Sequence, residues 1–435
     1  MPISITRKLL VHAAGALLCL SSLGAQADNY RNIENYLSEY QQMAAFDGVV
    51  LIAESGEVVW QKAFGFADYQ DERPMGTASR FRIASLSKQV TQAAIGRLAD
   101  DGKLTLRSRL ADFLPDFPNA RGITIRQLVE HTAGVAHTNR LDWMEMSNAM
   151  TLDEIVTGLA SEALLFKPGL DTQYSNGGYA LLAKVIEVAS GMNYRDFIEQ
   201  EFASAGYPSI GDEAAKETVP DMATRYAPGP EYGQRIAAQT YVTANRIGGG
   251  SLYANAEDIF RFFRDSFTGA LLSTETTQNI FARPADGDIT ITGRSPGALA
   301  QIYLDFENDL IVVTLSSNSA WPGSLNDDIV SLYRGENVEL LPAMRAENAL
   351  APHELNTFAG NFRMQQFGWD VVVEPHNADL IFKQGEISTA FVRTTDNLFH
   401  LPIYDWLCQF SAYNTEFECR QRSTKSDARF FFERI

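Results

Sequence analysis

A serine and a lysine three residues apart are the first side chains in this sequence that suggest chemistry. Ser85 and Lys88 stand in the run FRIASLSK (81–88), directly before a stretch with helical periodicity. Residues i and i+3 of a helix are neighbours, so the hydroxyl and the amine share one face. A serine at a helix start also meets free backbone N–H groups and the positive end of the dipole. The pair predicts a serine nucleophile activated by a lysine whose pKa is lowered by burial or neighbours.

A tyrosine and an asparagine form the second candidate group. Tyr174 and Asn176 stand in the run KPGLDTQYSNGGY (167–179), a loop that leads into a predicted helix. A tyrosine here can shuttle a proton where a nearby cation favours its phenolate, and an asparagine can hold a substrate amide. The same Tyr-x-Asn spacing occurs at 30–32 and 253–255, which fit a helix entry and a loop. The order of the surrounding motifs selects residues 174–176.

Six motifs occur in a fixed order along the chain. They are FRIASLSK (81–88), DGKL (101–104), ITIRQL (123–128), HTAG (131–134), PG with YSN (168–176) and GGGSL (248–252). Together they resemble the serine β-lactamase-like and penicillin-binding protein superfamily, most of all the branch of class C β-lactamases, D-aminopeptidases and esterases. The resemblance covers residues 30–335, and the tail from residue 350 resembles a small lipocalin-like β-barrel.

The resemblance implies a role for each matched residue. Ser85 would be the acylated nucleophile, Lys88 its hydrogen-bonded activator, and Tyr174 the general base and later the acid. Asn176 would orient the substrate. The oxyanion donors would be the backbone N–H groups of Ser85 and Arg294, and such donors contribute about 3–4 kcal/mol each to transition-state stabilisation. The resemblance implies no metal and no organic cofactor.

The third family motif departs from its usual pattern, which is Lys-Thr-Gly or His-x-Gly followed by Pro-Gly. Thr292, Gly293 and the Pro-Gly at 296–297 are present, but Ile291 stands where a cation or an imidazole belongs. That group helps to lower the pKa of the tyrosine and attracts a substrate carboxylate. Carboxylated β-lactams are therefore expected to bind poorly. Arg294 is a nearby cation, but strand periodicity directs its side chain away from the face of Gly293.

Two other patterns compete with this site. Residues 293–297 match Gly-x-Ser-x-Gly, the nucleophile elbow of α/β-hydrolases, in which the N–H after the serine stabilises the oxyanion. Pro296 follows the serine here and has no N–H, so we reject this interpretation. His131 is a second candidate base, but it ends a predicted helix, where a buried imidazole usually caps carbonyl groups. We expect His131 to have a structural role.

The elements that must position these residues indicate one mixed domain. A helix is predicted at 30–45 and a β-hairpin at 48–60, where apolar β-branched runs flank a glycine turn. Helical segments with three- and four-residue apolar spacing follow at 85–100, 107–114, 124–131, 152–160, 177–189, 194–203 and 256–267. Strands are then predicted at 288–292, 299–303 and 309–315, and a helix at 325–334. The early hairpin and the late strands imply one sheet built from both ends of the chain.

The chain changes character after a linker-like stretch at 342–352. Short strands at meander spacing predict a small antiparallel barrel or sandwich, at 369–373, 380–382, 388–392, 399–402, 407–413, 417–422 and 429–434. Cys408 and Cys419 lie on neighbouring predicted strands. Outside the reducing cytosol they are expected to form a disulfide, with two buried free thiols as the alternative.

Composition and the first residues indicate where the protein acts. The 435 residues have an ordinary globular composition and a formal charge of −18, which argues against nucleic-acid or anionic-lipid partners. Arg7 and Lys8, an apolar run and the small residues 25–27 predict a signal peptide, with a retained N-terminal anchor as the alternative. The apolar run is shorter than the roughly 20 residues of a membrane-spanning helix. The histidines show no metal-binding spacing.

The sequence therefore predicts a signal peptide at 1–27, a serine β-lactamase-like hydrolase domain at 28–340 and a lipocalin-like β-barrel domain at 350–435. The predicted fold class is mixed α/β, an antiparallel sheet with a helical subdomain plus a small antiparallel barrel. The predicted protein is a periplasmic serine hydrolase for a small-molecule or peptide substrate (an amide, a D-amino-acid peptide or an ester), without a membrane span in the mature chain. Two alternatives remain: a silent relative that binds cell-wall peptide or a partner, and a barrel that is itself the functional module. The sequence sets no oligomeric state.

Overall fold

The computed structural model describes residues 26–144, 148–213, 218–239, 241–281, 287–320, 325–339, 351–377, 379–385, 387–395, 398–422 and 428–435. They form two compact units. The sheet unit comprises Asp47–Ala227 and Ile236–Ser319, and the barrel unit comprises the described residues up to Phe46, Pro228–Arg235 and Ala320–Ile435. The predicted leader up to residue 25, and the predicted linker up to residue 350, lie outside the described residues.

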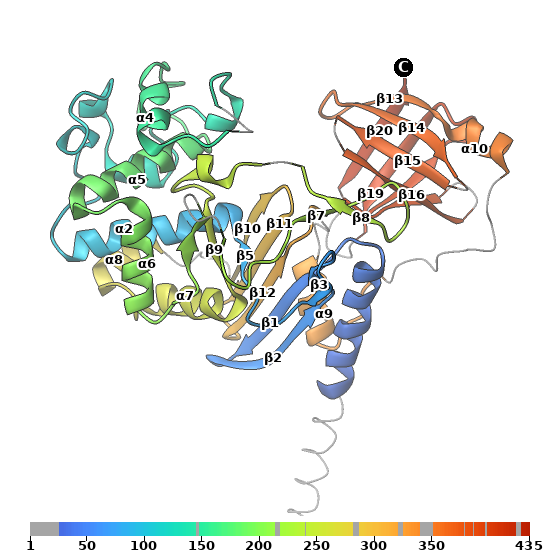
Figure 1. Ribbon diagram of the computed structural model, residues 1–435, viewed down its shortest axis with the longest axis horizontal. Helices are drawn as coiled ribbons and strands as arrows, with labels where there is room; N and C mark the ends of the chain where they lie inside the picture. Colours follow the sequence, from blue (N-terminus) through green and yellow to red (C-terminus); the bar gives the residue numbers. More distant parts are fainter. Residues whose placement is uncertain are drawn as a thin grey trace, which may run out of the picture. The chain divides into compact units, whose positions relative to one another are not determined.

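An antiparallel sheet of five strands forms the centre of the sheet unit (Figure 1). The order across it is β10 (Asp288–Ser295), β11 (Ala298–Asp305), β12 (Leu310–Ser316), β1 (Gly48–Glu54) and β2 (Glu57–Phe64). Strand β1 pairs with β12 on one side and β2 on the other, with Leu51 opposite Val313 and Gln61. Strands from distant parts of the chain therefore share one sheet, as predicted, and β10 lies at its edge.

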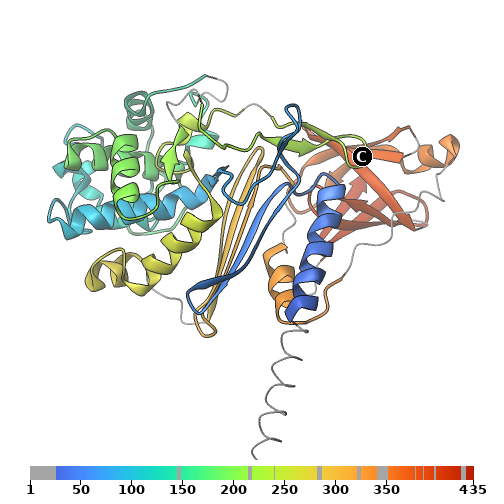
Figure 2. The ribbon, with the colours of Figure 1, turned by 60° about the horizontal axis from the view of Figure 1, so that its bottom comes forward.

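The helical part of the sheet unit follows the β1–β2 hairpin along the chain. Its α-helices are α2 (Ser87–Asp100), α3 (Ile125–Val129), α4 (Leu152–Ala160), α5 (Asn176–Ser190), α6 (Tyr194–Ser204), α7 (Ala256–Thr268) and α8 (Thr274–Ile280). Helix α7 packs on β12 and β1, and α5 contacts α2, α3, α4 and α6 (Figure 2). The buried face of α5 therefore lies at the centre of the helical part.

In the sheet unit one predicted helix is wrong and one observed α-helix was not predicted. The segment 107–114 holds only the 3-10 turn η2 (Leu110–Asp112). The N–H of Leu110 bonds to the carbonyl of Ile123, and the carbonyl of Ser108 accepts from Ile125, so this backbone pairs across the chain instead of within a helix. The side chain of Ser273 caps helix α8 by accepting from Thr276 N. The helix was not predicted because its sequence is mostly polar and shows no apolar periodicity.

Short elements complete the described part of the sheet unit and its connections. The short strands are β3 (Phe66–Asp68), β4 (Arg73–Pro74), β5 (Phe81–Arg82), β6 (Gly211–Asp212), β7 (Tyr226–Pro228), β8 (Arg235–Ala237) and β9 (Leu252–Ala254). The 3-10 turns besides η2 are η1 (Ala84–Leu86), η3 (Ala120–Gly122), η4 (Thr138–Arg140) and η6 (Thr243–Arg246). Turn η1 packs on β10 and β11, which brings it to the edge of the sheet.

The barrel unit contains a closed antiparallel barrel of eight strands. They are β13 (Gly360–Met364), β14 (Asp370–His376), β15 (Asp379–Gln384), β16 (Ile387–Thr395), β17 (Leu398–Leu401), β18 (Trp406–Phe410), β19 (Glu416–Gln421) and β20 (Arg429–Arg434). Strand β13 was not predicted; it pairs with β20 and closes the barrel. The predicted fold class is therefore confirmed, with a barrel rather than a sandwich in the tail.

Aromatic side chains and a disulfide fill the core of the barrel. The buried rings are Phe362, Phe382, Phe391, Phe399, Phe410, Phe417 and Phe432, each at most 2% exposed. Cys408 and Cys419 lie directly opposite each other on β18 and β19 and form the predicted disulfide. Because these rings contact one another at centroid distances such as 4.4 Å between Phe417 and Phe432, the barrel interior is a packed core.

The helices of the barrel unit are residues 26–42, α9 (Leu325–Tyr333) and α10 (Pro352–Phe358). A buried polar cluster links the first of them to the barrel. Arg422 donates from Nε to Asp405 Oδ1 at 2.9 Å, and His400 Nε2 lies 2.9 Å from the same oxygen. Tyr40 donates to Asp405 Oδ2 at 2.5 Å, and Arg422 donates to the Tyr40 hydroxyl. The charges of Arg422 and Asp405 are therefore paired with each other within the barrel unit.

Among the described residues, no helix combines the length and the apolarity needed to cross a membrane.

Candidate active site

Ser85 lies in a tight turn at the edge of the sheet. It is the middle residue of η1, immediately before α2, and its neighbour Ala84 adopts a left-handed backbone conformation with φ 45°. Strand β10 passes very close to this turn. A Cβ at Gly293 would lie 2.2 Å from the Ile83 carbonyl oxygen and 2.9 Å from the Ser85 nitrogen, so only glycine fits there. The predicted residues Ser85 and Gly293 are therefore brought together.

Lys88 occupies the first turn of α2 and is 3% exposed. Its Nζ donates to Asn176 Oδ1 at 2.7 Å and to the Gly249 carbonyl at 2.6 Å, and lies 3.5 Å from Ser85 Oγ. Burial and the nearby guanidinium of Arg246 lower the pKa of Lys88 to about 7. A neutral lysine amine has two hydrogens and one lone pair. The two hydrogens are used in the short bonds to Asn176 Oδ1 and the Gly249 carbonyl, so the lone pair remains to accept from the Ser85 hydroxyl.

The loop that carries Gly249 is fixed to α2 by side-chain hydrogen bonds. Thr91 Oγ1 donates to the Gly248 carbonyl at 2.6 Å, and Leu252 N donates to Ser87 Oγ at 3.1 Å. The serine and the threonine are fully buried. The second acceptor of Lys88 is therefore a rigid backbone carbonyl, supplied from 161 residues further along the chain.

Tyr174 lies directly before α5 and reaches the nucleophile. Its Oη is 2.7 Å from Ser85 Oγ, and Lys88 Nζ lies 4.6 Å from the centre of its ring. Partial desolvation raises the pKa of Tyr174 above its ordinary value, although the hydrogen bond with Ser85 opposes this shift. At neutral pH the phenol is therefore protonated while the pKa of Lys88 lies near neutrality.

Helix α5 begins at Asn176, and its start is held from two sides. Ser175 caps the helix by accepting from Gly178 N, and its hydroxyl donates to the Ala136 carbonyl at 2.9 Å. The Asn176 amide is oriented because Oδ1 accepts from Lys88 and Nδ2 donates to Asn139 Oδ1 at 3.1 Å. Asn176 is therefore positioned as a fixed link between Lys88 and the opening of the site.

Two histidines flank Tyr174, and sequence reasoning recognised neither as part of the site. His131 Nδ1 accepts from Ser175 N at 3.1 Å, and its ring lies 4.7 Å from the Tyr174 ring. His137 lies edge-on to Tyr174 at 5.5 Å. Burial and the charge of Lys88 lower the pKa of both imidazoles to about 4, so both are neutral. His131 accepts a backbone N–H, whereas the sequence predicted that it would cap carbonyl groups.

These residues surround a small cleft of about 180 Å³. Its lining comprises Ala84, Ser85, His137, Asn139, Tyr174, Asn176, Tyr241, Arg246, Gly249, Gly250, Arg294 and Ser295. Arg294 lines the cleft, and it is exposed while Gly293 is buried, as strand alternation predicts. Thr292 does not, and its hydroxyl accepts from Gln301 at 3.5 Å. No local motif marked Tyr241 or Arg246.

The competing nucleophile elbow at 293–297 has the wrong local structure. Ser295 ends β10, and the turn at 296–297 leads directly into β11, with Ser295 paired opposite Ala298. A nucleophile elbow requires a helix after its serine. The segment is therefore a β-hairpin.

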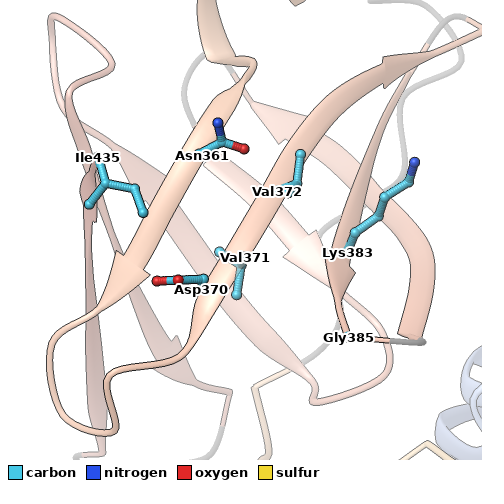
Figure 3. A pocket seen from close by; sticks show the side chains of 7 residues that line it. All are labelled: Asn361, Asp370, Val371, Val372, Lys383, Gly385 and Ile435. Atoms are coloured by element: carbon cyan, nitrogen blue, oxygen red, sulfur yellow. The ribbon is translucent and has the colours of Figure 1, made fainter.

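A second, shallower hollow of about 540 Å³ lies on β13, β14 and β15 of the barrel (Figure 3). Its lining residues are Asn361, Asp370, Val371, Val372, Lys383, Gly385 and Ile435. Asp370 is paired with Arg363 at 2.7 Å, and Lys383 is paired with Glu374. Because both charged side chains of the hollow are paired, it offers no catalytic group. Among the described residues, no cluster of histidine, cysteine, aspartate and glutamate has the makings of a metal site.

The sequence of this chain is similar to those of known proteins. A family model described as Beta-lactamase matches residues 33–330. Penicillin-binding protein 4* of Bacillus subtilis is 32% identical over 259 residues, which cover 54% of this chain and 56% of the relative. The chain thus spans little more than half of that relative's length. Teichoic acid D-alanine hydrolase of Staphylococcus aureus is 23% identical over 310 residues, 66% of this chain and 73% of the relative.

The fold is also found among solved structures. The D-amino acid amidase from Ochrobactrum anthropi SV3 is similar with a TM-score of 0.59 and 19% identity. The similarity covers 70% of this chain and 98% of the amidase. At this level of identity the match establishes a shared fold.

Proposed function

This chain belongs to the beta-lactamase family, and we propose that it is a serine hydrolase that forms an acyl-enzyme on Ser85. The proposed substrate is an amide, a D-amino-acid peptide or an ester met outside the cytoplasm. One observation carries the proposal: Ser85 Oγ lies 2.7 Å from Tyr174 Oη and 3.5 Å from Lys88 Nζ, beside an open cleft. A hydroxyl, an amine and a phenol in mutual reach suit acyl transfer.

The pKa directions assign the first proton transfer to Lys88. The family resemblance implies that Tyr174 is the general base, but the raised pKa of its phenol favours the protonated form at the start. In the proposed acylation, neutral Lys88 takes the Ser85 proton while Oγ attacks the substrate carbonyl. Tyr174 then gives its proton to the leaving group. The contact of 3.5 Å must shorten in the complex, as resting catalytic hydrogen bonds often do.

Deacylation uses the charges that acylation leaves behind. Lys88 is now an ammonium and Tyr174 a phenolate. The phenolate removes a proton from water, the hydroxide attacks the acyl carbonyl, and the Lys88 ammonium returns a proton to Ser85 Oγ as the ester bond breaks. The products are a carboxylic acid and the starting enzyme, so protons balance over the cycle. Tyr174 keeps its predicted base role in this second half.

The oxyanion is proposed to bind between η1 and β10. The predicted donors are the backbone N–H groups of Ser85 and Arg294, and the close approach at Gly293 brings their two segments together. Each donor of this kind contributes about 3–4 kcal/mol to transition-state stabilisation. Any side chain at Gly293 would separate the two segments, because its Cβ would collide with the Ile83 carbonyl.

The substrate class rests on the motif and on the relatives. Ile291 packs against the main core, so the third motif contributes no cation there, and carboxylated β-lactams are not the proposed substrates. The names of two similar proteins refer to D-alanine and to D-amino acids, which favours a D-amino-acid amide, peptide or ester. The disulfide between Cys408 and Cys419 supports a location outside the reducing cytosol.

Intact-mass analysis after treatment with a broad phosphonate probe tests the proposal. We expect one adduct on Ser85, absent in Ser85→Ala and formed more slowly in Tyr174→Phe. Ser85→Ala should also abolish turnover of a D-alanyl amide while its Tm stays within a few degrees of the parent. The adduct should persist in Ser295→Ala, which removes the other serine of the cleft. Unchanged turnover in Ser85→Ala would refute the site.

A further inference from the structure

A cation that lies outside the third family motif (residues 291–297) lines the cleft. Arg246 ends η6, is 3% exposed and lines the cleft. Its Nε donates to Tyr241 Oη at 2.8 Å, and its guanidinium carbon lies 5.1 Å from the centre of that ring. Tyr241 also lines the cleft. The two side chains form one unit, held by a hydrogen bond and a cation–π contact.

We infer that this Arg246–Tyr241 pair positions the substrate, and that Tyr241 donates a hydrogen bond to a carboxylate oxygen of it. The inference rests on the proposed function and narrows its substrate class to the D-amino-acid peptides that have a free carboxylate. The pair takes over the anion recognition that Ile291 cannot provide. The residues that bind the substrate carboxylate therefore lie in the loop around η6 instead of on the edge strand β10.

The direction of the hydrogen bonds at Tyr241 supports this role. A phenol has one proton to donate and lone pairs to accept with. Arg246 Nε occupies a lone pair, so the phenol proton must point elsewhere. No described residue accepts it. Tyr241 lines the cleft, and a substrate oxygen placed there would satisfy this donor. Because the phenol accepts from a guanidinium, its O–H becomes a stronger donor than an isolated phenol.

The charges that line the cleft favour an anion. Arg246 and Arg294 are its two charged lining residues, and no carboxylate of the described chain lines it. The whole chain carries a formal charge of −18. Positively charged side chains beside a cleft attract anionic groups of a substrate. A cleft of about 180 Å³ suits a small carboxylate group.

The backbone around the pair is anchored independently of any substrate. Asn245 is 2% exposed, accepts from Met150 N at 2.7 Å and donates to the Asn148 carbonyl at 2.7 Å. Arg225 donates to the Tyr241 carbonyl at 3.0 Å. These bonds hold both ends of the segment 241–246. Positioning by preformed groups lowers the entropy lost on binding.

Arg246 also affects the reacting amine. Its charge adds to burial in lowering the pKa of Lys88. The other titratable or charged side chains around Lys88 are Tyr174, Tyr179, His131 and His137. Both imidazoles are neutral near pH 7, so Arg246 is the cation that acts on Lys88 in that range. Removing its charge should raise the pKa of Lys88.

Two matched substrates test the inference: an N-acetylated D-alanyl dipeptide with a free carboxylate and the same dipeptide as its C-terminal amide. In Tyr241→Phe, we expect kcat/KM for the carboxylate, relative to the amide, to fall by about tenfold or more, as for a lost hydrogen bond to a charged group. The loss should appear mainly in KM. Tyr413→Phe, which alters an 89% exposed phenol of the barrel unit, is the control and should leave the ratio unchanged.

A pH profile of kcat/KM distinguishes a role of Arg246 in the site from a purely structural role. In Arg246→Met, we expect the midpoint of the rise in kcat/KM to move above about pH 7, whereas Arg246→Lys should keep the midpoint but lose carboxylate preference. A merely structural role would leave the midpoint in place. If Arg246→Met fails to fold, Tyr241→Phe still decides, because it removes a single oxygen.

The outcomes distinguish this inference from the proposed function. An unchanged substrate ratio in Tyr241→Phe, or an equal loss on both substrates, overturns the inference but leaves the acyl-enzyme on Ser85 intact. Absence of the phosphonate adduct in the parent protein overturns the proposed function itself. A parent enzyme that prefers the amide over the carboxylate also overturns the inference.

Discussion

Lys88 in the sheet unit and Arg422 in the barrel unit are both buried cations, but their surroundings are opposite. Lys88 in the sheet unit is 3% exposed and Arg422 in the barrel unit is 0% exposed. Lys88 contacts the neutral oxygens of Asn176 and Gly249, and its pKa falls to about 7. For Arg422, burial alone would lower the pKa, but Tyr40 and Asp405 raise it above the ordinary value.

The difference between these cations is the presence of a carboxylate. Burial of a charge is unfavourable unless an opposite charge compensates it. Asp405 compensates Arg422, so this cation remains charged and its contribution is to hold the barrel unit together. Among the described residues no carboxylate pairs with Lys88, and the pKa of its amine is therefore lowered to near neutral pH. Lys88, which has no carboxylate partner among the described residues, is the proposed base, whereas Arg422, which is paired with Asp405, has a structural role.

Replacing the uncompensated cation should give the largest effect on activity. We expect Lys88→Met to lower turnover by about 10³-fold or more, as for other groups that act together with a nucleophile. The Tm should stay the same or rise, because a desolvated amine is removed. Lys184→Met, which alters a lysine paired with Asp153 and Glu187, is the matched control. Steady-state kinetics and thermal unfolding measure both, and turnover within tenfold of the parent would contradict the assignment.

Replacing the compensated cation should act on stability alone. We expect Arg422→Met to lower the free energy of unfolding by about 3–5 kcal/mol, because Asp405 would remain buried without its main partner. Its neighbour Arg420 forms a half-exposed pair with Glu339, so Arg420→Met should cost at most about 1 kcal/mol. Urea unfolding compares the two. An equal effect of both substitutions would remove the distinction drawn between the two cations.

The disulfide provides a further test within the barrel unit. We expect the double variant Cys408→Ser, Cys419→Ser to lose about 2–4 kcal/mol of stability, because the crosslink restricts the unfolded chain. Labelling of Ser85 should persist under conditions where the variant is folded. Urea unfolding with and without reductant is the measurement. A parent protein whose stability does not respond to reductant would contradict the expectation.

The pH dependence of kcat/KM tests whether Lys88 is the buried cation that loses its proton near neutral pH. Lys88 must be neutral to accept the Ser85 proton, and its folded pKa is about 7. Below this pH the neutral fraction falls tenfold per unit, so kcat/KM should decline about tenfold per unit as pH drops and level off above pH 7. A profile that is flat between pH 5 and 8 would show that Lys88 is not the titrating base.

Local sequence patterns located the reacting residues. Ser85 and Lys88 are neighbours because helical spacing alone places i and i+3 on one face. Tyr174 and Asn176 were found because the order of the surrounding motifs distinguishes residues 174–176 from the other two Tyr-x-Asn sequences. The sheet was predicted because β-branched runs at both ends of the chain need partners. Helix α8 and strand β13 were missed because neither shows a long apolar period.

The tertiary structure decided the charge state of the site and the composition of its walls. The pKa of Lys88 depends on burial by α5 and the loop around Gly249, which comes from 161 residues away. Tyr241 and Arg246 carry no motif, and they line the cleft because buried hydrogen bonds of Asn245 fix their loop. The sequence alone indicated the candidate reacting groups, because short motifs in a fixed order mark them. Only the fold determined their protonation and what they recognise, because both depend on contacts between segments far apart in the chain.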